Sequence, residues 1–181
     1  MCLCLVIQLY STYLSHLKER NLHLSHFYFI GQFILLSSFY AKILKGKKLI
    51  SFIKKTSFLV IILSIGYYGL YPKDFLKWNV FEITITSIPI LVYSFLFFTQ
   101  NIEIKSTKYF IYFNSGLFIY LLSSTLLFTL GNIGLEDAKM VSIKRLVWKF
   151  NSFLYIVYQV LVFIEWYKNF RIKKHQNINQ V

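Results

Sequence analysis

Six long stretches of the chain contain no Asp, Glu, Lys or Arg, and they run over 1–17, 21–41, 56–72, 83–102, 109–135 and 150–164. A helix needs about 20 mostly apolar residues to cross a bilayer. Within hydrocarbon the backbone must satisfy its own hydrogen bonds, and these apolar runs are continuous rather than alternating as in a barrel. The pattern predicts an all-α integral membrane bundle of about six transmembrane helices, near 1–16, 26–44, 56–72, 79–100, 108–131 and 147–167.

The first predicted helix is the shortest of the six. No repeat, linker or long hydrophilic stretch separates the helices. We therefore expect a single transmembrane domain over 1–167, followed by a basic tail over 168–181.

The composition supports a lipid environment. Apolar residues make up 56% of the chain, aromatic residues 20% and charged residues 15%, whereas soluble domains contain about 25% charged residues. The net charge of +13 comes from short clusters between apolar runs, not from a basic helix face, which argues against nucleic acid as a partner. The expected partner of these clusters is the anionic headgroup layer of the bilayer.

Lysine and arginine also predict the orientation, because they favour the cytoplasmic side. One side of a six-span chain receives twelve of them: Lys42, Lys45, Lys47, Lys48, Lys54, Lys55, Lys105, Lys108, Lys168, Arg171, Lys173 and Lys174. The other side receives eight: Lys18, Arg20, Lys73, Lys77, Lys139, Lys144, Arg145 and Lys149. Both termini are therefore predicted to be cytoplasmic.

Signatures of catalysis, cofactor binding and metal binding are missing from the sequence. Cys2 and Cys4 have neither disulfide nor zinc spacing and are interpreted as buried or lipid-facing thiols. A cluster of His16, His23 and His26 could bind a transition metal or respond to pH, but interfacial histidines are the favoured interpretation. We expect no enzymatic activity, no cofactor and no metal.

Polar residues at membrane depth are the candidate functional groups, because burying them in lipid is costly. In the fourth predicted helix Glu82, Thr86, Pro89 and Tyr93 share one face. Pro89 would free the carbonyl of Ile85 for a neighbouring hydroxyl. Glu82 is either an interfacial carboxylate that pairs with Lys77 or a loop lysine, or a carboxylate that responds to protons or a ligand.

A second polar stripe lies on the last predicted helix. Its members recur at helical spacing and should face the bundle interior: Asn151, Tyr155, Tyr158 and Glu165, with Gln159 beside them. The fifth predicted helix carries Asn114, Thr125 and Thr129, and on its other face the small residue Gly116, which allows close helix approach. These groups form either structural hydrogen bonds between helices or an internal polar cavity.

Several segments resemble one family. The run from Asn21 to Tyr28, then Gln32 to Tyr40, resembles an early helix and its entrance; Tyr112-Phe-Asn-Ser-Gly116 and Trp148-Lys-Phe-Asn151 with Tyr155 resemble later helices. The family comprises small, functionally unassigned multi-pass bacterial membrane proteins that are similar to membrane-embedded sensor modules found alone or beside histidine kinases. Its members are expected to have seven helices, so this chain would lack the first span.

The resemblance implies a sensor or signalling accessory of the bacterial cytoplasmic (inner) membrane, acting through a membrane signalling partner such as a histidine kinase. A small transporter or channel is the alternative, with Glu82, Asn114, Asn151 and Glu165 as its polar path. A membrane enzyme ranks third, since Ser123, Ser124 and Thr125 have no His or Lys near them in sequence.

Overall fold

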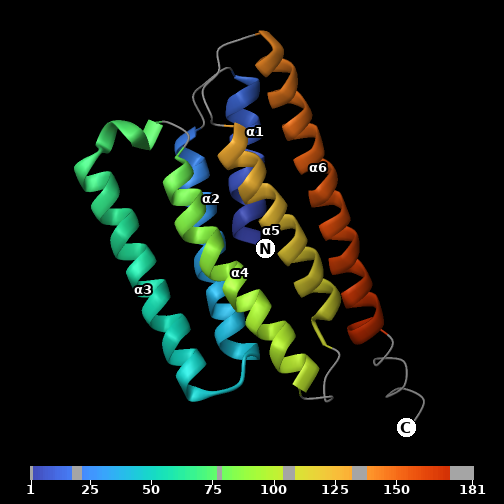
Figure 1. Cartoon of the computed structure of the whole chain (residues 1–181). Coiled ribbons are helices and arrows are strands. Elements are labelled where there is room, and N and C mark those ends of the chain that lie inside the picture. Colours follow the sequence, from blue (N-terminus) through green and yellow to red (C-terminus); the bar gives the residue numbers. More distant parts are fainter. Residues whose placement is uncertain (1, 18–21, 77–78, 104–108, 132–137, 172–181) are drawn as a thin grey trace. The chain divides into compact units, whose positions relative to one another are not determined.

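The computed structural model describes residues 2–17, 22–76, 79–103, 109–131 and 138–171. The regular elements within these ranges are helices (Figure 1): α1 (Cys2–His16), α2 (Leu22–Ile43), α3 (Lys47–Leu70), the short 3₁₀ helix η1 (Pro72–Leu76), α4 (Val80–Glu103), α5 (Ile111–Gly131), α6 (Ala138–Trp166) and a π-helical turn η2 (Tyr167–Arg171). The all-helical fold agrees with the sequence prediction.

The chain divides into two compact units, Met1–Tyr93 and Ser94–Val181. The boundary falls inside α4, whose first part belongs to the first unit and whose second part belongs to the second. A single transmembrane domain over 1–167 stays a prediction.

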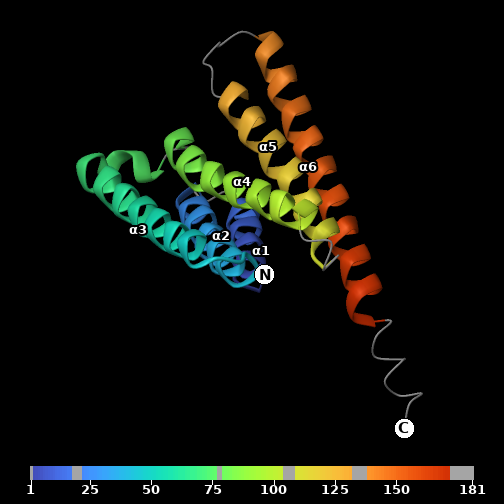
Figure 2. The ribbon, with the colours of Figure 1, turned by 60° about the horizontal axis from the view of Figure 1, so that its bottom comes forward.

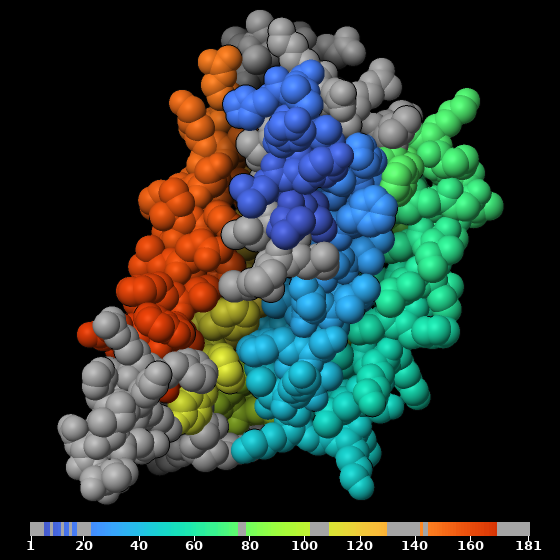
Figure 3. All heavy atoms as spheres, turned by 180° about the vertical axis from the view of Figure 1, so that it is seen from behind, coloured from blue at the N-terminus to red at the C-terminus, as the bar shows by residue number. Residues whose placement is uncertain are grey.

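In the first unit α2 and α3 are joined by a tight turn and run side by side (Figure 1). Gly46 has φ +114°, a backbone conformation that residues with a Cβ rarely adopt, and it lets the chain reverse there. On the face shown in Figure 3, α1 lies along α2. At the far end of α3, Tyr71 donates its N–H to the carbonyl of Tyr67 (2.8 Å), and Pro72 starts η1 because proline cannot continue the helix.

In the second unit α5 and α6 form an antiparallel pair (Figures 1 and 2). Gly116 makes this close approach possible. A Cβ at Gly116 would lie 3.0 Å from Leu161 Cδ1 and 3.1 Å from Tyr158 Cδ2, so a larger residue would crowd the contact.

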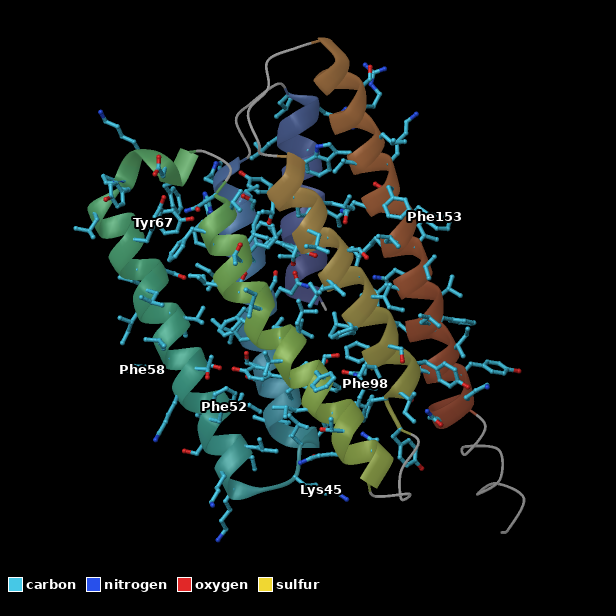
Figure 4. All side chains as sticks on the ribbon, in the orientation of Figure 1. Lys45, Phe52, Phe58, Tyr67, Phe98 and Phe153 are labelled. Carbon is cyan, nitrogen blue, oxygen red and sulfur yellow. The ribbon has the colours of Figure 1, made fainter. Side chains whose placement is uncertain are left out.

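Four helical segments are long and apolar enough to cross a membrane: Lys47–Leu70, Val80–Asn101, Ile111–Thr129 and Arg145–Asn169. Their outer faces are apolar, as a lipid-exposed surface requires; Phe58 on α3 and Phe153 on α6 are 68% and 58% exposed and point outward in Figure 4. The chain is therefore a helical membrane protein with at least these four candidate spans among its described residues. α1 has only 15 residues and α2 is not among these four candidate spans, so six spans remain a proposal.

Two helices begin nine residues earlier than the sequence predicted. α3 starts at Lys47 rather than at 56, and α6 starts at Ala138 rather than at 147. Both early turns are rich in lysine, which has good helix propensity and extends its charged end away from apolar surroundings. Counting charges as helix breaks therefore placed these starts too late. Of the predicted basic tail, 172–181 lies outside the described residues.

Candidate functional site

The first unit contains a buried polar cluster at the end of α3 that adjoins η1. We call it the His26–Glu82 site, and its members are His26, Tyr68, Phe75, Asn79 and Glu82. His26 and Glu82 are each 2% exposed. They come from α2 and α4, while Tyr68 comes from α3, so three helices converge on one carboxylate.

The central contact joins His26 Nδ1 and Glu82 Oε2 in a hydrogen bond. The hydroxyl of Tyr68 donates to the same Oε2 at 2.6 Å and lies 2.8 Å from His26 Nδ1. Glu82 Oε2 therefore forms hydrogen bonds with both His26 and Tyr68. Its other oxygen, Oε1, is buried and has no hydrogen-bond partner in the described part of the chain.

The local sequence explains how Glu82 is positioned. Asn79 directly precedes α4, and its Oδ1 accepts the backbone N–H of Glu82 (3.3 Å), as expected of a helix N-cap residue. The Asn79 amide also donates to the Tyr68 hydroxyl at 3.2 Å. In the Asn-x-x-Glu pattern the glutamate often returns to the cap residue, but here its carboxylate turns to α2 and α3. The first turn of α4 also favours the carboxylate's negative charge through the helix dipole.

The short helix η1 covers the site. His26 Nε2 donates to the backbone carbonyl of Phe75 (2.9 Å), and the Phe75 ring packs on His26 and Tyr68 with centroid separations of 4.9 and 5.4 Å. Beside the Phe75 ring, Tyr67 donates to Asp74 Oδ2 (3.1 Å). This hydrogen bond is a second contact between α3 and η1, after that of Phe75 with Tyr68. Figure 4 shows Tyr67 at this end of α3 and Lys45 near the other.

The hydrogen bonds determine how many protons the pair holds. Phe75 O only accepts, so His26 Nε2 must carry a hydrogen. A single further proton then lies between Nδ1 and Oε2, whichever atom holds it. The pair is neutral overall in this state, as an ion pair or as two uncharged groups, which is compatible with burial.

Sequence reasoning singled out Glu82 but not its partners. The predicted partner Lys77 lies outside the described residues, and the partner in the structure is His26, which is buried rather than exposed at an interface. The Asn79-x-x-Glu82 spacing could have indicated the N-cap, but no local signal reveals a contact between residues 56 positions apart. The hydroxyl of Thr86, which was predicted to share a face with Glu82, donates to the carbonyls of Glu82 and Ile83 in its own helix.

The candidates of the second unit do not form one site. Glu165 is 3% exposed and accepts the backbone N–H groups of Phe110 (2.6 Å) and Tyr112 (2.8 Å), with Asn169 as a further donor. It therefore accepts hydrogen bonds from N–H groups at the start of α5, where a helix has no preceding carbonyl of its own to receive them. Asn151 lies fourteen residues earlier on α6, about 21 Å away at the rise of an α-helix.

The remaining predicted residues of this unit have separate surroundings. Asn114 is fully buried; its Oδ1 accepts from the Ser94 hydroxyl (3.0 Å) and its Nδ2 donates to the Ser94 carbonyl (3.1 Å). Tyr158 is buried and stacks on Tyr120 with centroids 5.7 Å apart. Of the other predicted residues, Gln159 is half-buried and Tyr155 is exposed. Asn151 is buried, and its Oδ1 has no hydrogen-bond partner within the described residues.

Among the residues that the structure describes, no three His, Cys, Asp or Glu side chains lie close enough to hold a metal ion. His16 is exposed and His23 is half-buried.

Comparisons with known protein families, with curated proteins and with solved structures find no match for this chain.

Proposed function

We propose that the protein is a non-enzymatic membrane sensor or signalling accessory and that its stimulus is a change in proton concentration at the His26–Glu82 site. The observation that carries the proposal is the buried His26–Glu82 hydrogen bond, which contains one shared proton. Histidine is the side chain that ordinarily changes charge between about pH 5 and 8. Ionisable groups within a membrane span are default sites of function, and Glu82 lies in the first turn of the candidate span Val80–Asn101.

Gain or loss of a proton would disturb the site in opposite ways. Without the shared proton, the lone pairs of Nδ1 and Oε2 would face each other and repel. With a second proton the buried pair would carry a net positive charge, and the unpaired Glu82 Oε1 is an oxygen open to protonation. The other titratable neighbours are Tyr68 on α3 and, further out, the Tyr67–Asp74 pair.

Such a disturbance would reach η1 directly. His26 binds the Phe75 carbonyl through the ring that shares the proton, so a shift of the imidazole weakens the contact that holds η1. With both termini in the cytoplasm, η1 would face the outside, where a sensor meets its stimulus. The partner would be a membrane signalling protein such as a histidine kinase.

A small transporter is the runner-up, and the contacts of its candidate path favour it less. Both oxygens of Glu165 are bound by the start of α5, and both polar atoms of the Asn114 side chain are bound by Ser94. A conducted ion or substrate would have to displace these bonds.

Hydrogen–deuterium exchange of the η1 backbone in lipid nanodiscs tests the proposal, after correction for the intrinsic pH dependence of exchange. We expect the protection of the η1 backbone against exchange to change with pH. Glu82→Gln should remove this dependence, because the amide can donate to Nδ1 but cannot titrate.

His23→Gln is the matched control, since His23 lies one turn from His26 and outside the site. This variant should retain the wild-type pH profile. A flat wild-type profile, or a profile that Glu82→Gln leaves unchanged, would exclude the site as the proton-responsive element.

A further inference from the structure

The first unit contains a second polar layer deeper along the same three helices. Three buried side-chain hydroxyls have no hydrogen-bond partner within the described residues: those of Ser37 on α2, Ser57 on α3 and Tyr93 on α4. Tyr93 is fully buried and Ser37 is 4% exposed. An unsatisfied buried hydroxyl is costly, so three of them in one unit require an explanation.

The three hydroxyls repeat the spacing of the His26–Glu82 site. Ser37 follows His26 by eleven residues, Tyr93 follows Glu82 by eleven, and Ser57 precedes Tyr68 by eleven on the oppositely directed α3. Eleven residues make about three helical turns, a rise of about 16 Å with a rotation of only about 20°. The same faces that converge at His26, Tyr68 and Glu82 therefore converge again three turns deeper.

Side-chain contacts support this convergence. The Tyr93 ring lies 6.0 Å from the ring of Tyr40 on α2 and 6.2 Å from the ring of Phe52 on α3. The hydroxyls of Thr56 and Ser57 on α3 both lie near the Tyr93 hydroxyl, yet neither Ser57 Oγ nor Tyr93 Oη has a hydrogen-bond partner within the described residues. The Ser57 and Tyr93 hydroxyls thus lie near each other, and the eleven-residue spacing from His26 places Ser37 on the face of α2 that is turned to them.

We propose that Ser37, Ser57 and Tyr93 together bind a water molecule in the interior of α2, α3 and α4. Buried water typically makes about three hydrogen bonds to polar groups that would otherwise lack partners, and these hydroxyls can both donate and accept. A neutral ligand fits, since none of the three hydroxyls is charged and the lysines within one turn of Ser57, Lys54 and Lys55, are exposed. The bound water would continue the polar interior about 16 Å inward from the His26–Glu82 site, towards the middle of a core about 30 Å thick.

Between the layers the spacing also places hydroxyls. Ser64 and Thr86 lie four residues inward from Tyr68 and Glu82, and both are buried. Each donates to a carbonyl of its own helix, Ser64 to Val60 at 2.9 Å and Thr86 to Glu82 at 2.8 Å. They are satisfied without water, which distinguishes them from the deeper layer and makes Ser64 a matched control.

The stability of three variants tests the proposal, independently of any proton response. If water is bound, Ser37→Ala, Ser57→Ala and Tyr93→Phe each lower the unfolding midpoint in nanodiscs. The Ser37→Ala and Ser57→Ala losses should be less than additive in the double variant, because either change already disrupts the water. Removing dry, unsatisfied hydroxyls would instead leave stability unchanged or raised, without coupling, and this result would overturn the proposal.

A measurement on the unmodified protein does not depend on the folding of variants. Radiolytic hydroxyl-radical footprinting oxidises side chains beside bound water even when they are buried. We expect Tyr93 to be oxidised despite its full burial and the signal to fall in the Ser37→Ala/Ser57→Ala variant but not in Ser64→Ala. Absence of Tyr93 oxidation in the wild type would equally overturn the proposal.

Discussion

His26 Nδ1 and Glu82 Oε2 share a hydrogen bond across 56 residues of sequence, in a site where both side chains are 2% exposed. The opposite ring nitrogen of His26 is bound to a backbone carbonyl, so the two residues have one proton to share. One shared proton keeps the buried pair neutral, and the same imidazole holds η1 through the Phe75 carbonyl.

Loss of the His26 imidazole and replacement of the Glu82 carboxylate by an amide should lower the free energy of unfolding by different amounts. His26→Ala leaves a buried carboxylate without its main partner, which typically costs about 3–5 kcal/mol. Glu82→Gln retains a donor towards Nδ1 and should cost about 1 kcal/mol. Chemical unfolding in mixed micelles near neutral pH measures both. Equal losses for the two variants would contradict a shared proton between the pair.

Two adjacent tyrosines provide a second comparison. Tyr68→Phe removes the hydroxyl that donates to the Glu82 carboxylate and should cost about 1.5–3 kcal/mol, as for hydrogen bonds to charged groups. Tyr67→Phe removes a bond to Asp74 and should change stability little. The same unfolding assay compares them, and the interpretation fails if Tyr67→Phe proves the more damaging change.

Glu165 should act as a structural cap for α5. Glu165→Ala leaves the Phe110 and Tyr112 N–H groups without their acceptor and should cost about 1–3 kcal/mol. Glu165→Gln retains an acceptor and loses only the interaction of charge with the helix dipole, about 0.3–1 kcal/mol. Exchange of the first turn of α5 should rise in the alanine variant. Unchanged protection there would argue against capping.

The proposed orientation can be tested at two exposed lysines. Lys73 lies in η1 and Lys48 in the first turn of α3. In a background with Cys2 and Cys4 replaced by serine, a membrane-impermeant maleimide should label Lys73→Cys in intact cells. Lys48→Cys should react only after the cells are opened. The reverse labelling would place the His26–Glu82 site on the cytoplasmic side.

The sequence alone predicted the helices better than the contacts between them. Charge-free runs located α2, α4 and α5 within a few residues, because hydrocarbon requires such runs. The same criterion predicted the starts of α3 and α6 too late in the sequence, because lysines lie inside the first turns of these helices. Helical spacing placed Glu82 and Tyr93 on one face, and Gly116 at a close helix contact.

Local sequence patterns did not predict the hydrogen-bond partners of the buried polar residues. His26 was interpreted as an interfacial histidine because its acidic neighbour in space is remote in sequence. Glu165 was grouped with Asn151 because both lie on one stripe of α6, whereas the structure uses Glu165 at the start of α5. Such pairings depend on how the helices associate, which hydrophobic periodicity does not determine.

The most direct measurement is nitrogen NMR of histidine-labelled protein in lipid bilayers, with His26 assigned by comparison with a His26→Asn variant. We predict that Nε2 carries a proton and that a single further proton lies between Nδ1 and Glu82 Oε2. In Glu82→Gln, Nδ1 should be an unprotonated acceptor of the amide N–H. A His26 with its proton on Nδ1 and a bare Nε2 would contradict the one-proton site.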